Sequence, residues 1–234
     1  MPYSEVVPDE LYAVSSAIED YAKAIYALEV REDEPVSTTA LAGRLGLTPG
    51  SVSGMLRRLD ERGLITHEPY RGVRLTAAGR QVALEVLRHH RLLELFLAQA
   101  LDMPWDRVHD EAEVLEHVLS EELERLIADK LGDPAVDPHG DPIPDSELRM
   151  REGPTASLES LQPGDRGIFV RVSDSDPEML RYLAARRISP GDRFEVRDRQ
   201  PFGGPLFIAL GGEVHAVGGR LARAMRVELD GPAR

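Results

Sequence analysis

A segment rich in proline, glycine and aspartate, residues 132–154, separates two parts of the chain that differ in periodicity. Before this segment, apolar residues recur at three- and four-residue steps, which is typical of amphipathic helices. After residue 157, glycines separate short apolar runs, which is typical of the strands of a small β-barrel. We therefore expect a mainly α-helical protein with a small all-β domain in its C-terminal part.

Capping residues indicate where the helices begin and end. Gly46 fits the end of a short helix, and Thr48 with Pro49 is typical of an N-cap followed by proline in the first turn. Helices are expected over residues 15–31, 38–45, 49–62 and 76–100, from residue 104 onward, and over 121–131, with a hairpin over 64–75. Strands are expected over 167–172, 193–196, 206–210 and 214–217, with one short helix over 177–186, whereas residues 1–14 indicate a loose arm.

Composition excludes several classes of protein. The chain has no cysteine, which excludes disulfides, thiolate nucleophiles, iron–sulfur clusters and cysteine zinc sites. No apolar run approaches the ~20 residues of a membrane helix, and the acidic N-terminus, broken by prolines, is not a secretory signal. We expect a cytoplasmic protein with no membrane partner.

The charge of the chain is unevenly distributed. The net charge is −13, which by itself argues against nucleic-acid binding. Residues 37–80, however, hold seven arginines against three acids, whereas residues 90–150 hold 16 acids against five bases, with four of the seven histidines. This distribution indicates two separate functions on one chain.

The basic stretch has the pattern of a winged helix-turn-helix, since two short helices are followed by a hairpin. Apolar residues of the second helix, Val52, Met55, Leu56 and Leu59, recur at helical spacing and are expected to pack inward. Its other face offers hydroxyls and arginines to phosphate oxygens. Gly54 stands where a base-reading side chain is expected, which indicates either close approach of the backbone or readout by DNA shape. The candidate DNA-contact residues are Thr48, Pro49, Ser51, Ser53, Arg57, Arg58 and Arg71. The alternative is a three-helix core with a solvated arginine face.

The acidic stretch places metal-ligand side chains at helical spacing. His90 and Glu94 are four residues apart, and His109, Glu113, Glu116 and His117 form one stripe of the next expected helix. Carboxylates with imidazoles and no thiolate suit Mn²⁺ or Fe²⁺. Asp20 on the first helix is a further candidate ligand. The alternative is a solvated acidic face with incidental histidines, and His67, His89, His139 and His215 are interpreted as structural.

Together these residues resemble the diphtheria toxin repressor family of metal-activated transcriptional repressors, and its manganese-sensing branch most of all. The matching stretches are IEDYAKAIYALE, LAGRLGLTPGSVSGMLRRLDERGLI, YRGVRLTAAGR, HRLLELFL, VHDEAEVLEHVLSEELE and PHGDPIP. The C-terminal PGDRGIFVRVSD and LAARRISPGDRFEV resemble the SH3-like domain shared with ferrous-iron transport proteins. The resemblance implies a winged helix over residues 1–76, a dimerisation and metal-binding domain over 77–150 and an SH3-like, FeoA-type domain over 151–234.

The resemblance also implies two metal sites. His90, Glu94 and His109 match the family's ancillary site, and Asp20, Glu113, Glu116 and His117 match its primary site. Asp174 and Asp176 are the nearest oxygen donors in the SH3-like domain. Three features depart from the family pattern. Lys23 replaces a glutamate ligand of the manganese branch, Gly54 replaces a polar side chain, and the family's glutamate and glutamine ligands in the SH3-like domain have no clear match here.

The function implied is that of a homodimeric, Mn²⁺-activated transcriptional regulator of metal-homeostasis genes. Fe²⁺ is the second candidate metal, with Co²⁺, Ni²⁺ or Cd²⁺ as surrogates. Its partner is a palindromic double-stranded operator, and it acts on no small-molecule substrate. Two alternatives come from other classes: a dinuclear metal-dependent hydrolase, and a winged-helix regulator with an organic effector.

Overall fold

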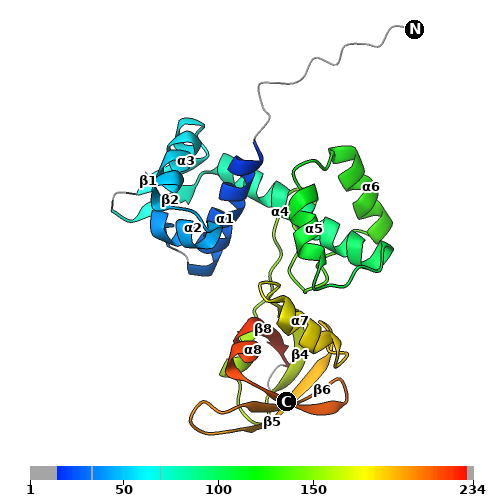
Figure 1. The fold of residues 1–234 in the computed structure, drawn as a ribbon. Helices are drawn as coiled ribbons and strands as arrows, with labels where there is room; N and C mark the ends of the chain where they lie inside the picture. The colour runs from blue at the N-terminus through cyan, green and yellow to red at the C-terminus, as the bar shows by residue number, and fades with distance from the viewer. Residues whose placement is uncertain (1–14, 33, 69, 231–234) are drawn as a thin grey trace, which may run out of the picture. The chain divides into compact units, whose positions relative to one another are not determined.

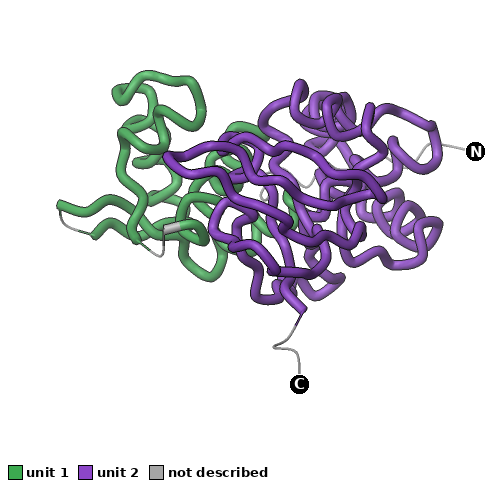
Figure 2. The backbone as a smooth tube through the Cα atoms, turned by 90° about the horizontal axis from the view of Figure 1, so that it is seen from below, with its two compact units in different colours: residues 1–87 green, residues 88–234 purple. Residues whose placement is uncertain are grey.

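The computed structural model describes residues 15–32, 34–68 and 70–230. It divides into two compact units, residues 1–87 and 88–234 (Figure 2). The expected N-terminal arm lies outside the described residues. No described helix is long and apolar enough to cross a membrane. In chain order (Figure 1), the elements are α1 (Ser16–Glu32), α2 (Thr38–Leu45), α3 (Pro49–Glu61), β1 (Ile65–Glu68), β2 (Gly72–Leu75), α4 (Ala77–Ala100), α5 (Val108–Leu115), α6 (Glu121–Leu131), β3 (Ala156–Ser157), η1 (Leu158–Ser160), β4 (Arg166–Val172), α7 (Pro177–Ala184), β5 (Arg193–Arg199), β6 (Leu206–Leu210), β7 (Glu213–Val217), α8 (Gly219–Ala224) and β8 (Met225–Leu229).

The first unit is a winged helix-turn-helix, as expected. Gly46 ends α2 in the left-handed conformation, and the Thr48 side chain caps α3 by accepting the N–H of Ser51. The inward residues Val52, Leu56 and Leu59 are buried, whereas the opposite face of α3 is exposed. Strands β1 and β2 pair antiparallel and form the wing. The spacing of apolar residues and the two cap signals therefore fix the orientation of α3.

A buried carboxylate ties α1 to the wing. Glu29 is 5% exposed, and its Oε1 accepts the backbone N–H of Leu75 at 2.8 Å. Its Oε2 pairs with the Arg80 guanidinium at 3.1 Å, near the start of α4. A buried carboxylate is tolerated only when its oxygens are satisfied in this way. Glu29 therefore fixes α1, the end of the wing and α4 in one arrangement.

The helices of the second unit differ from expectation at one boundary. The helix expected from Pro104 begins at Val108 and ends at Leu115, because residues 105–107 form a turn. Glu116 is therefore the C-cap residue, and His117 lies in the turn that follows. Helix α6 begins after Ser120, whose side chain accepts the N–H of Leu123. Buried apolar residues of α4, α5, α6 and the following segment form one core.

The proline-rich segment is an ordered connection built around one turn. Asp137 Oδ1 accepts the backbone N–H groups of His139, at 2.8 Å, and of Asp141, at 2.9 Å. A short antiparallel bridge joins Val136 to Pro142. Asp137 and His139 are consequently buried, although the composition of the segment indicates a linker or an extended connection.

The C-terminal part of the second unit is a six-stranded antiparallel sheet in the order β3-β8-β4-β5-β6-β7, wrapped around its own apolar core. All four expected strands are present. The expectation of a single helix here is wrong, since α8 follows β7, and strands β3 and β8 were also not predicted. Strand β8 alternates Met225 and Val227 with charged residues over five positions, which is too short a pattern to identify a strand by itself.

Candidate metal centre and nucleic-acid interface

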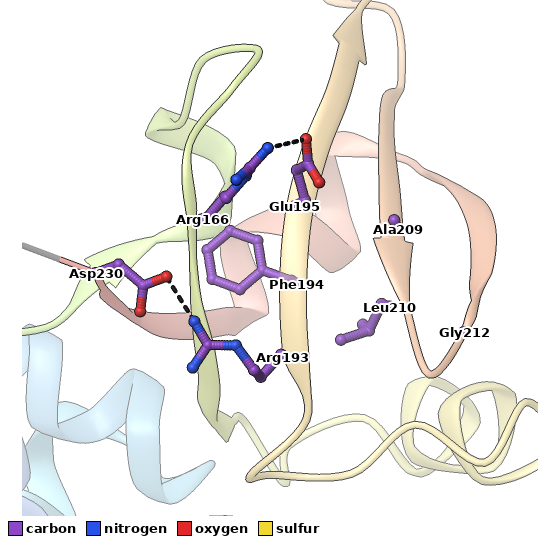
Figure 3. Close-up of a pocket in the computed structure, with 8 residues that line it drawn as sticks. All are labelled: Arg166, Arg193, Phe194, Glu195, Ala209, Leu210, Gly212 and Asp230. Carbon is purple, nitrogen blue, oxygen red and sulfur yellow. Dashed lines mark hydrogen bonds and ion pairs between the residues drawn. The ribbon is translucent and has the colours of Figure 1, made fainter. Parts of the chain in front are cut away.

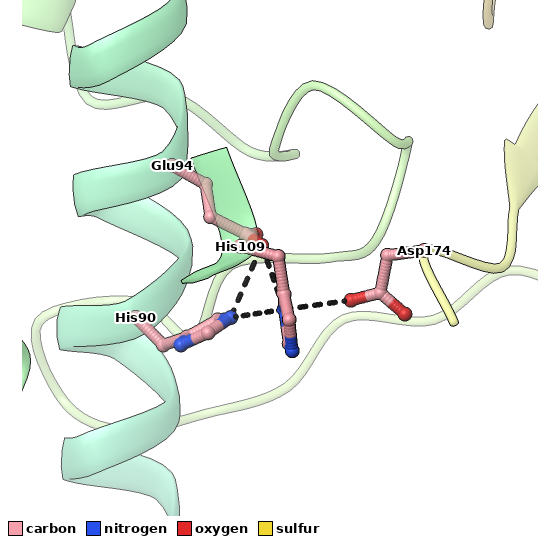
Figure 4. A group of neighbouring side chains, drawn as sticks. All are labelled: His90, Glu94, His109 and Asp174. Carbon is pink, nitrogen blue, oxygen red and sulfur yellow. Dashed lines mark hydrogen bonds and ion pairs between the residues drawn. The ribbon is translucent and has the colours of Figure 1, made fainter. Parts of the chain in front are cut away.

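Four side chains from α4, α5 and the barrel converge on one point (Figure 4). His109 Nδ1 lies 3.1 Å from His90 Nε2 and 3.3 Å from Glu94 Oε1. Its other close neighbour is Asp174 Oδ2, at 3.2 Å. His90 Nε2 lies 3.1 Å from the same Glu94 oxygen. One donor atom from each residue lies within 4.8 Å of the others, which is close enough for all four to hold one ion. Helical spacing on α4 and the start of α5 at Val108 bring these side chains together.

A second donor group adjoins the first through the other nitrogen of His90. His90 Nδ1 lies 2.5 Å from Glu116 Oε2 and 3.8 Å from Glu113 Oε1. Glu113 Oε1 also lies 3.8 Å from His109 Nε2, and His109 precedes Glu113 by one turn of α5. His117 Nε2 lies 3.5 Å from Glu116 Oε1. The donors expected on α4 and after the start of α5 thus form one continuous array of imidazoles and carboxylates.

The electrostatics of the first group favour charged side chains. Hydrogen bonds to Asp174 and Glu94 raise the pKa of His109 to about 10. The pKa of Glu94 is lowered despite burial, because His109 and His90 hydrogen-bond to its carboxylate. The pKa of Asp174 is lowered by the same hydrogen bond from His109. The group therefore contains carboxylates that remain ionised and are suited to a cation.

His139 lies in a further donor group, although the sequence analysis interprets it as structural. The ring is fully buried, and its Nδ1 lies 3.9 Å from Glu94 Oε2. Glu94, Asp137 and His139 form a further group of donors close enough to share an ion. Burial raises the pKa of Asp137, with the nearby Asp141 and Glu94 carboxylates adding to the effect. The spacing Asp-x-His in the turn is the only local signal, and it is too short to identify a ligand pair by itself.

The hydrogen bonds of His139 test whether this group fits a metal. His139 Nε2 donates to the Trp105 carbonyl at 2.8 Å, so in the neutral ring the lone pair is on Nδ1. Within the described residues, Nδ1 is a buried nitrogen without a hydrogen-bond partner. Such an atom costs free energy unless something accepts its lone pair. A lone pair facing carboxylates is what a divalent cation requires, so the residues fit a metal ion.

Asp20 and Asp176 are the two remaining ligands that the sequence predicts. Asp20 lies on α1 in the first unit, and its place in a metal site stays a prediction. Asp176 lies outside the donor groups found among the described residues. Its side chain caps α7 by accepting the N–H of Glu178 and pairs with Arg220 at 2.5 Å. Of the two barrel aspartates proposed from the sequence, the structure places only Asp174 beside the imidazoles.

His89 forms hydrogen bonds next to the donor groups. Its Nδ1 lies 3.2 Å from the Glu116 carbonyl oxygen, and its Nε2 lies 3.1 Å from Glu124 Oε2. Arg88 donates to the other Glu124 oxygen at 2.5 Å and to the Pro144 carbonyl at 2.7 Å. Hydrogen bonds from His89 and Arg88 lower the pKa of Glu124. This network fixes the backbone of Glu116, in keeping with the structural role assigned to His89.

The exposed face of α3 is the candidate nucleic-acid interface. Arg57 and Arg58 are exposed, and a side chain at Gly54 would meet nothing within 4 Å. Gly54 therefore leaves the helix backbone open to close approach. Ser53 is exposed, and its Oγ donates to the Pro49 carbonyl at 2.9 Å.

The wing supplies a further arginine whose charge is already paired. Arg71 forms ion pairs with Glu34 and, at 3.5 Å, with Glu68. Arg74 also pairs with Glu68, at 2.8 Å. Because both partners of Arg71 are carboxylates, a phosphate would have to replace them.

A pocket in the barrel offers a weaker candidate site (Figure 3). It is lined by Arg166, Arg193, Phe194, Glu195, Ala209, Leu210, Gly212 and Asp230. Arg166 pairs with Glu195 at 3.0 Å, and Arg193 pairs with Asp230 at 2.6 Å. Each arginine already has a carboxylate partner, so the pocket has little attraction for an anion.

Comparisons with known proteins agree with this division of roles. Residues 13–73 match the family model "Iron dependent repressor, N-terminal DNA binding domain" and residues 76–145 match "Iron dependent repressor, metal binding and dimerisation domain". Residues 156–229 match the FeoA domain. The iron-dependent repressor IdeR of Mycobacterium leprae is 33% identical over 224 residues, which are 90% of this chain and 96% of that protein. The diphtheria toxin repressor of Corynebacterium jeikeium is 36% identical over 163 residues, or 68% of each chain.

Solved structures of metal-dependent regulators are also similar to this chain. A manganese-dependent transcriptional repressor in complex with manganese is 41% identical, has a TM-score of 0.84, and covers 91% of this chain and 99% of its own. The manganese regulator SloR is 30% identical with a TM-score of 0.72, covering 91% of this chain and 98% of its own.

The winged helix and the imidazole–carboxylate array define a metal-dependent, DNA-binding transcriptional regulator. The chain belongs to the iron-dependent repressor family, also known from its diphtheria toxin repressor members. It is therefore an iron- or manganese-dependent transcriptional repressor and not an enzyme. The expected family and fold class are confirmed, and the hydrolase alternative is wrong.

Proposed function

We propose that this repressor is a homodimer activated by Mn²⁺, with Fe²⁺ as the second candidate metal, and that it binds a palindromic operator of metal-homeostasis genes. The observation that carries the choice of metal is the donor set, which combines carboxylates with imidazoles and contains no sulfur among the described residues. The likeness to a manganese-dependent repressor bound to manganese supports it.

The ligands are assigned to two neighbouring sites. The first uses His90, Glu94, His109 and Asp174, with Asp137 and His139 as additional donors beside Glu94. The second uses Glu113, Glu116 and His117 and, from the first unit, Asp20. A bound Mn²⁺ supplies a divalent charge that these carboxylates and lone pairs can share. Asp176 is not retained, because it already caps α7.

The positions of these residues on α1 and α4 explain how metal binding changes DNA affinity. Asp20 and Glu29 lie on the same helix, α1, and Glu29 fixes that helix to the wing and to Arg80 of α4. His90 and Glu94 lie further along α4. A metal ion bound by side chains of both α1 and α4 would therefore favour one arrangement of the winged helix. Metal raises DNA affinity if that arrangement is the one that binds DNA.

Exposed apolar side chains on α5, on α6 and in the turn between them support the homodimer. Val114 is 70% exposed and Val118 is 76% exposed, and Leu123 and Leu126 add to the same region of the chain. Large apolar side chains exposed together are typical of an interface. Two-fold symmetry would present two α3 helices, and a palindromic operator would match them with half-sites ~34 Å apart. The domain limits proposed remain 1–76, 77–150 and 151–234.

Arg57→Ala and Arg58→Ala are expected to weaken binding to operator and non-operator DNA alike. Each lost phosphate contact should reduce the slope of log affinity against log salt by about one unit. The measurement is Mn²⁺-dependent DNA binding over a series of salt concentrations. Arg186→Ala is the matched control, because that exposed arginine lies in the barrel. Unchanged salt slopes in both variants would place the DNA contacts elsewhere.

Asp20→Met combined with Glu113→Cys is expected to lose activation by Mn²⁺ and to keep activation by Fe²⁺ or Co²⁺. A thioether and a thiolate are softer ligands, whereas carboxylates tolerate the weakly directional Mn²⁺. The measurement is anaerobic DNA binding titrated with each metal in turn. If the double variant keeps the metal preference of the parent protein, these positions do not determine selectivity.

A further inference from the structure

Trp105, the only tryptophan of the chain, lies between the donor groups and the β-barrel. Its ring stacks on the ring of His139, with centroids 5.7 Å apart and planes at 24°. Its carbonyl accepts the Nε2–H of the same imidazole at 2.8 Å. One residue therefore sets both the plane and the tautomer of His139.

The other side of Trp105 contacts the barrel. Its indole N–H donates to the Leu180 carbonyl of α7 at 3.2 Å. The ring also packs against the apolar core of the barrel. Beside it, Asp106 pairs with Arg181 of α7 at 2.9 Å. Trp105 thus connects α7 directly to an imidazole of the donor group.

The turn that carries His139 is attached to the barrel as well. The His139 carbonyl accepts the N–H of Val172 on β4 at 2.9 Å. Gly140 has a φ of +89°, and a Cβ there would lie 1.8 Å from the Val170 carbonyl oxygen, so only glycine allows this approach. His139 is consequently held by the barrel on its backbone side and by Trp105 on its ring side.

This arrangement has a direct consequence for metal binding. A histidine ligand is oriented by the acceptor of its other ring N–H, and metal at one nitrogen makes the opposite N–H a stronger donor. For His139 that acceptor is the Trp105 carbonyl, and Trp105 is bonded to α7. Metal at Nδ1 would therefore strengthen the hydrogen bond that links His139 to the barrel.

We propose that Trp105 is a positioning residue that couples metal binding at His139 to the attachment of the FeoA-like barrel. The inference rests on the proposed assignment of His139 as a ligand. Since coupling between two sites is reciprocal, a barrel held by Trp105 raises metal affinity, and bound metal holds the barrel more firmly. This gives the barrel a role beyond the single carboxylate of Asp174.

The experiment measures hydrogen–deuterium exchange by mass spectrometry on the full-length protein, with and without Mn²⁺. It follows residues 137–141 and 177–184 in the parent protein and in Trp105→Ala, Trp105→Phe and Arg181→Ala variants. Trp105→Phe keeps a six-membered aromatic ring and removes the indole N–H together with the fused five-membered ring. Arg181→Ala is the matched control, because it breaks the neighbouring ion pair with Asp106 and leaves Trp105 and His139 in place.

In the parent protein, Mn²⁺ should slow exchange in both segments. In Trp105→Ala, we expect protection of 137–141 to persist and protection of 177–184 to be lost, with about a tenfold loss of Mn²⁺ affinity, as for other changes around a ligand. Trp105→Phe keeps a ring to stack on His139 but not the hydrogen bond to Leu180, so it should retain only part of both effects, and Arg181→Ala should behave like the parent protein. A purely structural role would instead speed exchange in 177–184 equally with and without metal.

Two different failures can be told apart. If His139→Asn binds as much Mn²⁺ with the same affinity as the parent protein, His139 is not a ligand, and the assignment fails together with the inference. If His139→Asn lowers Mn²⁺ affinity but Trp105→Ala keeps Mn²⁺-dependent protection of 177–184, the metal assignment stands and the coupling role of Trp105 is overturned.

Discussion

Glu94→Gln is expected to abolish Mn²⁺-dependent DNA binding while the protein remains folded. Glu94 is 1% exposed, and its two oxygens face three imidazoles, those of His90, His109 and His139. The amide has a similar shape and lacks the negative charge that a cation requires. Even residues that only orient ligands change metal affinity by ~10–100-fold, so loss of this shared carboxylate should cost at least about a hundredfold.

The measurement is Mn²⁺ affinity by equilibrium dialysis, combined with operator binding at saturating Mn²⁺. Glu121→Gln is the matched control, because Glu121 is an exposed acid in the first turn of α6. Thermal unfolding of both variants without metal checks that the fold is retained. Parent-like Mn²⁺ affinity in Glu94→Gln would show that the group around Glu94 is not the principal metal site.

The parts of the fold that follow from the sequence are those governed by local chemistry. The caps at Thr48 and Ser120 and the left-handed Gly46 depend on neighbouring residues alone, so their helix ends could be predicted. The start of α5 could not, because Pro104 fits the first turn of a helix equally well in sequence. Strand β8 depends on pairing with β3 and β4, which lie more than fifty residues earlier.

The same distinction separates the ligands that could be predicted from those that could not. His90 and Glu94 share a helix, so their spacing places them on one face. His139 comes from a turn whose position depends on the Asp137 carboxylate, the Gly140 approach to β4 and the Trp105 carbonyl. None of these contacts leaves a periodic signal. Asp174 and Asp176 are equivalent in sequence, and only the cap of α7 distinguishes them.

Mn²⁺ binding is expected to release at least one proton near neutral pH, and the principal source is His109. Hydrogen bonds to Asp174 and Glu94 raise its pKa to about 10, so the ring is protonated when no metal is bound. Only the neutral imidazole can bind a metal. Below about pH 10, apparent Mn²⁺ affinity should therefore increase with pH, by about tenfold per pH unit for each proton displaced.

The same shift determines how the stability of the metal-free protein depends on pH. The folded-state pKa of His109 lies above the ordinary value of ~6.5, so protonation favours the folded state. Its contribution is fully present below about pH 6.5 and is lost as the pH rises toward about 10. Metal should therefore add most stability at the alkaline end of this range, where it has fewer protons to displace.

The measurement is calorimetric titration of Mn²⁺ between about pH 6 and 8, in buffers that differ in ionisation enthalpy. The buffer dependence of the heat gives the number of protons released. His109→Gln should release fewer protons and show a shallower rise of affinity with pH, whereas His67→Gln, on the exposed face of the wing, should match the parent protein. A buffer-independent heat in the parent protein would mean that His109 keeps its proton when metal binds, and that His109 is not a ligand.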